Sequence, residues 1–373
     1  MNINNITYFQ NGEFKLGSIR IENGIYKKIQ NEPFDDGIDG RNLYLIPGFV
    51  DIHTHGISGS DFSNVDTLEI KKMLKDYLKD GVSFILPTTV AMEEDKLFKT
   101  LKTFNDYKND NGETNILGIH LEGPFINKKY KGALLEKYIL APDVLKFKKY
   151  LDINPNIKKV TYAIENDDLS LTKLLKEKGI SASIGHSCAK KEEVNKGIEF
   201  GVNSISHLFN AMTPITSRED SLALTGLLDD RLYTEIIMDF YHVKKEVIEL
   251  LIKAKPHDKI ICITDSIAAR GVPDGKYKLG EYDIDVIDGK CHLADGTIAG
   301  STLTFKQILK NLYELNISLI DVVKFTSLNA LASLNIEDVD LIIEGFPVSA
   351  CIIDQNYNLL TVLKNDQLLE VKD

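Results

Sequence analysis

The stretch LIPGFVDIHTHG, residues 45–56, marks the point where the pattern of the sequence changes. Before it, residues 1–45 contain short apolar runs separated by the turn signals Asn11-Gly12 and Asn23-Gly24, which indicates a small antiparallel β unit. After it, short apolar runs alternate with amphipathic helical patterns, which is typical of βα repeats around a parallel sheet. The stretch is therefore predicted to form the first strand of that parallel sheet.

The second pattern contains eight apolar runs with the length of buried strands. They are residues 45–53, 82–90, 115–121, 158–164, 180–185, 202–208, 233–239 and 259–265. Helical patterns at 66–81, 167–179 and 189–201 lie between them, and each ends in the glycine expected just beyond a helix C-terminus. Eight strands with intervening helices predict an α/β fold, a closed TIM-like (β/α)8 barrel.

The end of the chain returns to strand patterns. Residues 280–296 resemble a β-hairpin, two helical patterns follow at 304–316 and 319–335, and residues 350–371 again read as strands. The economical interpretation is one further β unit built from both ends of the chain. We therefore predict a small β-sandwich domain from residues 1–45 together with 344–373, and a barrel domain from residues 46–343.

Composition narrows the class of protein. The chain of 373 residues has a net charge of −11, which argues against nucleic-acid binding because that depends on clustered Lys and Arg. The sequence contains no apolar run long enough to span a membrane, and its start lacks the pattern of a signal peptide, so we expect a cytoplasmic protein without membrane contact. The four cysteines lie far apart, which argues against disulfides and against a thiolate zinc site.

Polar side chains gather at the ends of the predicted barrel strands, the face where barrel enzymes carry their active sites. The strand-end residues are His53 and His55 on the first strand, Glu122 after the third, His186 after the fifth, His207 on the sixth and Asp265 on the eighth. Of the eight histidines, only His257 and His292 lie clearly elsewhere. Side chains scattered without a function would also fall on helices and loops.

These residue types indicate a metal site. His53 and His55 are two residues apart, so on a strand both imidazoles point to one side and can bind a single cation. Alone, the pair is more often two polar residues at a strand edge. Together with Glu122, His186 and His207, it favours Zn²⁺ or Fe²⁺ with an open position for water, which is typical of a catalytic site.

Three further side chains have competing interpretations. Asp265 would cap the following turn if it stood alone, but opposite a metal it is a candidate general base. His120 lies two residues before Glu122 and is interpreted as a strand histidine that supports this carboxylate. His242 follows the seventh strand, where it either begins a helix at the surface or contacts substrate.

Six segments occur in a familiar order: PGFVDIHTHG, GIHLEGPFINKKYKGA, IGHS, SHLFNAMTPITSRE, ITDS and ADGTIAGSTLTF. Together they resemble the N-acetylglucosamine-6-phosphate deacetylase family of the amidohydrolase superfamily, over nearly the whole chain. HLEGPF and HLFNAM are the most specific segments, because PGFVDIHTHG and the aspartate of the eighth strand are shared by many amidohydrolases. The resemblance implies a metallohydrolase barrel with a small β-sandwich, and a homodimer.

The resemblance also implies an activity and a site. The family hydrolyses the acetamide of N-acetyl-D-glucosamine 6-phosphate to D-glucosamine 6-phosphate and acetate, in amino sugar catabolism and cell-wall sugar recycling. Glu122, His186 and His207 match its primary metal ligands, His53 and His55 allow a second ion, so that one or two divalent cations bind per subunit, and Asp265 matches its proton-transfer residue. The matched substrate-binding positions are Ala133, Asn210, Ala211, Arg218, Asp239, His242, Ile298, Ala299 and Gly300. In the family, the arginine that Arg218 matches reaches the sugar phosphate across the dimer interface.

The chain departs from the family pattern at three places. Leu134 stands where the family has a histidine that helps to polarise the acetamide carbonyl. Two aromatic residues, Phe240 and Tyr241, lie inside the segment that contains Asp239 and His242. A third change, at residues 345–349 in the terminal β unit, has no evident catalytic consequence.

Other functions remain as alternatives at this point. A related sugar such as N-acetylgalactosamine 6-phosphate would suit the same residues. Amidohydrolases that act on cyclic amides often bridge two metals with a lysine that ends strand four, but here that strand ends in Ala163-Ile164-Glu165. A non-catalytic relative would have lost metal ligands, and none is lost here.

Overall fold

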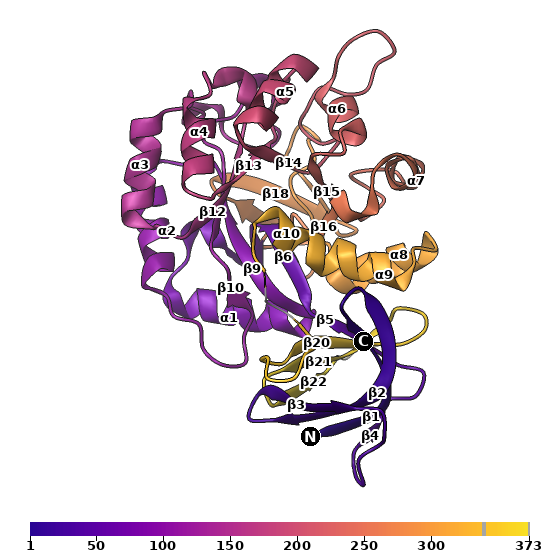
Figure 1. The fold of residues 1–373 in the computed structure, drawn as a ribbon. Helices are drawn as coiled ribbons and strands as arrows, with labels where there is room; N and C mark the ends of the chain where they lie inside the picture. The colour runs from indigo at the N-terminus through magenta and orange to yellow at the C-terminus, as the bar shows by residue number, and fades with distance from the viewer. Residues whose placement is uncertain (338–340, 372–373) are drawn as a thin grey trace.

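A parallel barrel forms the centre of the molecule (Figure 1). The structure, a computed structural model, describes residues 1–337 and 341–371. The barrel strands are β6 (Phe49–Thr54), β9 (Val82–Thr89), β11 (Ile119–Glu122), β12 (Ile157–Tyr162), β13 (Ser181–Ile184), β14 (Val202–Ile205), β15 (Tyr233–Ile237) and β16 (Ile260–Ile263). These eight strands correspond to the eight predicted runs, and neighbours in the chain pair in parallel. The predicted barrel is thus confirmed.

The third predicted strand is divided in two. Its first part, β10 (Asn115–Ile116), pairs with β9 alone, and β11 follows after a break. Gly118 lies in this break, where an added Cβ would approach the side chain of Lys158 to 2.3 Å. The close approach of the neighbouring strand explains the glycine and the interruption.

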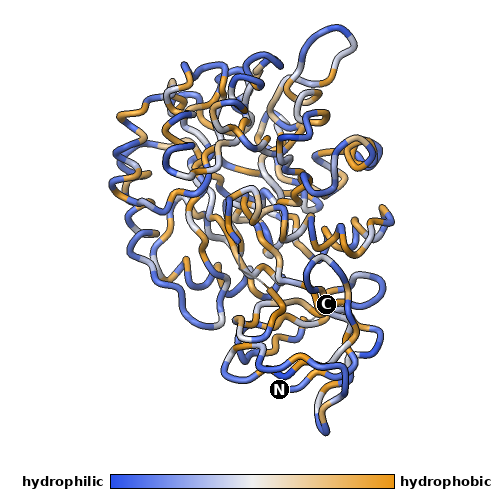
Figure 2. Tube along the Cα trace, in the orientation of Figure 1, coloured by the Kyte–Doolittle hydropathy of each residue, from blue (hydrophilic) through white to orange (hydrophobic). Residues whose placement is uncertain are grey.

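The helices between the strands pack around the outside of the barrel, as Figure 1 shows. They are α1 (Thr67–Lys79), α2 (Glu94–Asp106), α3 (Val144–Ile153), α4 (Ser170–Glu177), α5 (Lys191–Phe200), α6 (Leu222–Leu228), α7 (Lys245–Ala254) and α8 (Phe305–Glu314). Asp66 begins α1 by accepting hydrogen bonds from the backbone N–H groups of Leu68 and Glu69, and the Glu69 carboxylate accepts from Asp66 N. Figure 2 shows hydrophilic residues gathered in the outer loops and apolar residues running through the barrel.

The barrel closes between its first and last strands at the end that carries the candidate site. Asp265 N donates to His53 O at 2.9 Å, and His55 N donates to Ser266 O at 2.7 Å. The Thr264 hydroxyl donates to the buried Asp51 carboxylate at 2.6 Å, which joins the same two segments below. These bonds hold Asp265 beside the two histidines of β6.

A second sheet combines both ends of the chain (Figure 1). Its strands are β1 (Asn2–Gln10), β2 (Glu13–Glu22), β3 (Ile25–Gln30), β4 (Ile38–Asp39), β5 (Tyr44–Pro47), β20 (Ser349–Ile353), β21 (Leu359–Lys364) and β22 (Gln367–Glu370). β5 joins the two halves, because it pairs parallel with β1 and antiparallel with β20. The eight strands form one continuous sheet with an apolar core of its own that includes Ile19, Tyr26 and Val348. The expected β unit from both termini is confirmed.

Two insertions follow the last barrel strand. β17 (Gly275–Leu279), β18 (Tyr282–Ile287) and β19 (Lys290–His292) form a three-stranded antiparallel sheet, one strand more than the predicted hairpin. Later, α9 (Leu319–Val323), a π-helical segment (Lys324–Leu328) and α10 (Asn329–Ser333) form the helix predicted at 319–335. None of the described helices combines the length and the apolar surface needed to cross a lipid bilayer.

Candidate active site

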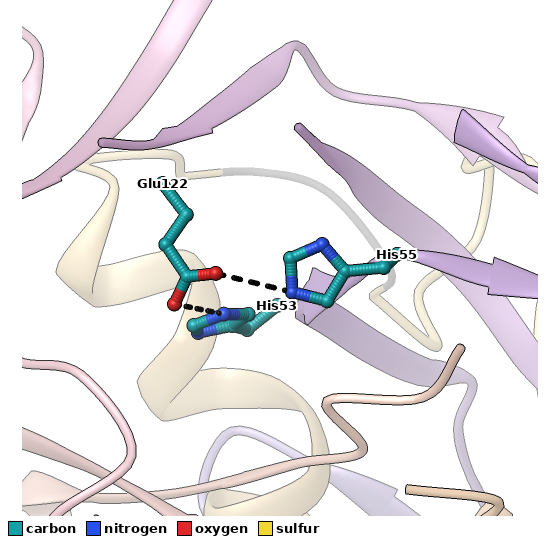
Figure 3. Close-up of side chains that lie close together, drawn as sticks. All are labelled: His53, His55 and Glu122. Carbon is teal, nitrogen blue, oxygen red and sulfur yellow. Dashed lines mark ion pairs between the residues drawn. The ribbon is translucent and has the colours of Figure 1, made fainter. Parts of the chain in front are cut away.

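The candidate site lies where the barrel strands end. His53 and His55 belong to β6, and Glu122 is the last residue of β11. Figure 3 shows the two imidazoles facing the Glu122 carboxylate from neighbouring positions. The three side chains are 0%, 3% and 5% exposed, so they form an interior polar cluster rather than a surface pair. The interpretation of His53 and His55 as exposed strand-edge residues is therefore wrong.

Three of the predicted residues lie just beyond their strands. β13 ends at Ile184, β14 at Ile205 and β16 at Ile263, each two residues before the site residue that follows it, which is His186, His207 or Asp265. The backbone of these three residues adopts positive φ angles of 49°, 30° and 49°. Non-glycine residues in this region are strained, and such strain concentrates at functional sites. The turn after each strand aims the side chain over the barrel opening.

The Glu122 carboxylate is the common centre of two groups of ligand-type atoms. The first, here called the β6 group, contains His53, His55 and Glu122, with Nε2 to carboxylate distances of 3.1 and 3.3 Å. The second, the β13–β14 group, contains Glu122, His186 and His207, with Nε2 to Oε1 distances of 3.1 and 3.0 Å. Within each group, the ligand atoms lie within 4.8 Å of one another.

The other ring nitrogen of three histidines fixes which nitrogen faces Glu122. The Nδ1 of His186 lies 2.8 Å from Tyr130 O, and the Nδ1 of His55 lies 3.2 Å from Thr88 O. A carbonyl oxygen can only accept, so each Nδ1 carries the hydrogen. In the neutral rings, Nε2 therefore presents a lone pair to the carboxylate.

His53 is held in the same tautomer by a carboxylate. Its Nδ1 donates to Glu235 Oε2 at 2.9 Å, and Glu235 is paired on its other side with Lys159. All three side chains are at most 1% exposed. A buried carboxylate behind a ligating imidazole is a recurrent support of metal sites, because it fixes the ring and increases its basicity.

The arrangement fits a divalent cation. In the neutral rings, the Nε2 lone pairs of His53, His55 and His186 face the Glu122 carboxylate, and none of these atoms can donate to another. His186 Nε2 and His207 Nε2 also lie only 3.1 Å apart. Acceptors that face one another repel unless a positive charge lies between them. Imidazole and carboxylate ligands suit a transition-metal ion.

The pKa values reflect the same concentration of charge. Burial would raise the pKa of Glu122, but the nearby histidines, His53 first, lower it well below its usual value. Burial would lower the pKa of His53, but the charges of Glu122 and Asp265 raise it to about 9. The two carboxylates therefore create a strongly negative site that favours a cation.

Asp265 lies between the β6 group and the open cleft. Its Oδ1 is 3.2 Å from His55 Nε2 and 3.7 Å from His53 Nε2, and its side chain is 13% exposed. Burial would raise the pKa of Asp265, but His53 and His55 lower it, so the side chain is ionised and can accept a proton. The interpretation as a simple turn cap does not account for these contacts.

A cleft of about 270 Å³ opens above the two groups. Besides His55, Glu122, His186, His207 and Asp265, the predicted residues that line it are Ala133, Asn210, Ala211, His242, Ile298 and Gly300. Residues that are far apart in the sequence, from His55 to Gly300, thus line one cleft. The prediction that His242 lies at the site rather than at the surface agrees with this position.

Three predicted substrate-binding residues lie outside the cleft lining. Asp239 accepts hydrogen bonds from the backbone of Tyr241 and His242 at 2.8 Å and from His242 Nδ1 at 2.6 Å, so it positions His242. Ala299 is 1% exposed, and its N–H donates to Cys291 O. Arg218 lies in an exposed loop.

Sequence reasoning missed Glu235 and Lys159 and placed His120 only in part. His120 hydrogen-bonds Thr88 and Thr161 at 3.1 and 2.7 Å, and its ring packs edge-on against His53 at 4.5 Å. It therefore supports His53 rather than the Glu122 carboxylate. The available signal for the missed pair was a charged residue in the middle of each of two otherwise buried strands.

The fold and the donor set together define a class, a barrel hydrolase that uses a divalent metal. Residues 44–369 match the amidohydrolase family, and the chain belongs to this family.

The relatives are more specific. The N-acetylglucosamine-6-phosphate deacetylase of Lysinibacillus sphaericus is 32% identical over 88% of this chain and 86% of its own length. A crystal structure of the deacetylase of the same name from Thermotoga maritima covers 99% of both chains at 34% identity, with a TM-score of 0.89. A mutant from Mycobacterium smegmatis in complex with N-acetyl-D-glucosamine-6-phosphate has 26% identity, 99% coverage of both chains and a TM-score of 0.92.

Proposed function

We propose that this enzyme hydrolyses the acetamide of N-acetyl-D-glucosamine 6-phosphate to D-glucosamine 6-phosphate and acetate. The observation that carries the proposal is the position of Asp265, an ionised carboxylate 3.2 Å from His55 Nε2, at the edge of two metal-binding groups and open to a cleft. A proton acceptor beside a metal site is what amide hydrolysis by water requires. Relatives with this activity match the chain over most of its length.

We propose Zn²⁺ or Fe²⁺ as the cofactor, with one or two ions per subunit. The β13–β14 group offers two imidazoles and a carboxylate, and the β6 group offers two more imidazoles to the same carboxylate. When bound, such a cation supplies Lewis-acid polarisation of the amide carbonyl and lowers the pKa of a water molecule towards about 7. Both groups are formed by residues of this chain.

Asp265 would carry the proton through the reaction. Its carboxylate accepts a proton from the attacking water, and the carboxylic acid then donates that proton to the departing nitrogen. One side chain thus acts first as base and then as acid, which amide hydrolysis needs because the amine leaves poorly as an anion. The backbone bond from Asp265 N to His53 O keeps the carboxylate in position for both steps.

The polar part of the cleft would bind the sugar. Asn210 lies over the barrel opening next to His207, and its side-chain amide donates weakly to the backbone at 3.3 Å, so it can turn towards a ligand. His242 is held by Asp239, while its Nε2 has no hydrogen-bond partner among the described residues. With Nδ1 donating to Asp239, the free Nε2 of the neutral ring accepts from a substrate hydroxyl. Burial would lower the pKa of His242, but Asp239 raises it, and the protonated ring would donate to a phosphate oxygen.

The phosphate requires a cation that the cleft lining does not supply. Among the residues that line the described cleft, none is a lysine or an arginine. Arg218 lies in the exposed loop after Asn210, where a second copy of the chain could receive it. We therefore propose a homodimer in which Arg218 of one subunit binds the phosphate in the cleft of the other, through a bidentate guanidinium contact.

An Arg218→Ala variant tests this arrangement. We expect KM for the phosphorylated sugar to rise about 10- to 100-fold, because a charge-assisted contact worth about 1.5–3 kcal/mol is lost. The kcat should change far less. An unchanged KM, measured on protein shown to be dimeric by light scattering, would remove Arg218 from the site.

The activity itself is tested by measuring acetate release from N-acetylglucosamine 6-phosphate, N-acetylgalactosamine 6-phosphate and the two unphosphorylated sugars. We expect the highest kcat/KM for the first substrate and a large loss without the phosphate. Metal analysis of the same sample identifies the ion. Absence of acetate release from either phosphorylated sugar in metal-loaded protein would overturn the proposal.

A further inference from the structure

A second cavity lies directly beside the catalytic cleft. It has a volume of about 140 Å³ and shares four lining residues with the cleft: Val90, Ala133, Leu134 and Leu279. These four side chains form a wall between the two spaces, here called the acyl wall. Val90, Leu134 and Leu279 are only 6%, 4% and 5% exposed and belong to one apolar cluster, so the acyl wall is closely packed.

The far side of the cavity is closed by charged and aromatic side chains. Glu281 accepts hydrogen bonds from Lys96, Lys137 and the Tyr138 hydroxyl, each at 2.8 Å. Behind this cap, Met92 and Tyr282 line the interior together with the acyl wall. The cavity is therefore an apolar space with a polar cap on the side away from the catalytic residues.

The acyl wall stands next to the metal-binding groups. Two of its residues, Ala133 and Leu134, follow Tyr130, whose carbonyl accepts the hydrogen bond from His186 Nδ1 at 2.8 Å. A Cβ at Gly132 would lie 3.4 Å from the His186 ring. Leu134 follows two residues later, and its backbone is held by Lys131 O at 2.9 Å and by the Tyr282 hydroxyl at 3.2 Å. A substrate whose amide carbonyl lies at the metal-binding groups would thus also have its acyl chain close to Leu134.

The two sides of the cleft differ in chemistry. Besides the acyl wall, the polar residues Asn210, His242 and Thr297 line the cleft, and they suit hydroxyl and phosphate groups. The acyl chain is the only hydrocarbon end of an N-acylated amino sugar, and it gains most by contact with an apolar surface. The acyl chain therefore fits against Leu134 while the sugar faces the polar side.

We propose that Leu134 sets the length of the acyl group that the enzyme removes, by separating the cleft from a cavity that would otherwise hold a longer chain. This inference rests on the proposed deacetylase function and names a specificity-determining residue for it. Shortening Leu134 joins the cavity to the cleft and creates a subsite for N-butyryl sugars. The reaction is unchanged: one water is consumed, the C–N bond breaks, and butyrate and the free amine leave.

The test compares kcat/KM for N-butyryl- and N-acetylglucosamine 6-phosphate. We expect Leu134→Ala to raise the butyryl-to-acetyl ratio at least about tenfold, because each methylene that a pocket can newly accommodate is worth about 10-fold or more in kcat/KM. Leu134→Val removes less of the acyl wall and should give a smaller rise in the same direction. It also keeps the test valid if the alanine variant does not fold.

Two control variants separate Leu134 from the rest of the cavity. Met92→Ala enlarges the cavity behind the acyl wall, and Glu281→Ala opens its cap, but both leave Leu134 in place. The ratio should stay within about twofold of the wild type for both. Melting temperature and metal content would show that all variants are folded and loaded.

The outcomes distinguish the proposed function from the role of Leu134. Absence of acetate release by the wild type contradicts the proposed function. Acetate release by the wild type together with an unchanged ratio in folded Leu134→Ala and Leu134→Val contradicts the role of Leu134 alone. A ratio that rises as much in Met92→Ala as in Leu134→Ala would also overturn it.

Discussion

The two metal-binding groups share Glu122 but are built in different ways. The histidines of the β6 group lie two residues apart on one strand, and the β6 group is supported from inside the barrel by Glu235 and by Thr88 O. The histidines of the β13–β14 group come from two strands and lie beyond their ends, on backbone with φ angles of 49° and 30°. There, the support is the carbonyl of Tyr130 in a loop that also borders the cleft.

The geometry of the two groups depends on different parts of the barrel. The β6 group depends on strand alternation and on a buried charge pair, so its geometry is independent of the loops. The β13–β14 group depends on strained turns and on a loop whose residues line the cleft. The Asp265 carboxylate lies within 3.7 Å of both β6 histidines, which links the proposed proton carrier to the β6 group.

The largest effect is expected for Glu122→Gln, because it removes the anionic ligand common to both groups. A bound metal lowers the activation free energy by several kcal/mol. Losing it should therefore decrease kcat at least about a thousandfold. Metal content should fall for both groups together. Retention of one full equivalent of ion, measured by mass spectrometry on folded protein, would mean that the groups do not share Glu122 in the way described.

Asp265→Asn should separate chemistry from metal binding. We expect metal content and KM to stay near the wild-type values, while kcat falls about 100- to 1000-fold, because general acid–base catalysis is lost. The asparagine keeps the size of the side chain and its contact with His55. A kcat close to that of the wild type would show that another group moves the proton.

Replacing both His53 and His55 by alanine tests whether the β6 group holds its own cation. Metal content should fall from about two ions to about one, because the β13–β14 group keeps its three ligands. The matched variant with alanine at His186 and His207 leaves the β6 group in place and should lose the other ion. An unchanged metal count in the first variant would limit His53 and His55 to positioning Asp265.

The smallest effect is expected for the buried pair behind His53. The double variant Glu235→Gln/Lys159→Met removes both charges, so that neither is left unpaired in the interior. Without the carboxylate behind it, His53 should bind its ion about 10- to 100-fold more weakly, as judged by competition with a chelator. Binding by the β13–β14 group serves as the internal control and should not change.

Much of the fold could be predicted because its signals are local. Alternation of buried strands and amphipathic helices, with glycines beyond the helix ends, indicates βα repeats without any tertiary information. The return of strands after residue 349 likewise indicates a β unit from both termini. The strand β17 was missed because GKYKL is largely exposed and polar, and pairing with β18 rather than its own pattern makes it a strand.

The site was predictable only where a residue acts alone at a strand end. His53, His55 and Glu122 follow from strand position, and His186, His207 and Asp265 follow approximately, because the turns that aim them lie just beyond the strands. Lys159 and Glu235 each stand out as a charged residue in a buried strand, but they lie 76 residues apart, so no local pattern reveals that they pair. Asp239 was predicted to contact substrate, but its carboxylate is occupied by His242, a contact that depends on the path of the loop.

The central claim is that acetate release depends on a cation held by Glu122 and its histidines, with Asp265 as proton carrier. The most direct measurement is a titration of chelator-treated wild-type protein with Zn²⁺ or Fe²⁺, in which acetate release from N-acetylglucosamine 6-phosphate and bound metal are followed together. The metal-free protein should release no acetate, and activity should return in proportion to the ions bound. Full activity in protein with less than about a tenth of an ion per subunit would contradict the account.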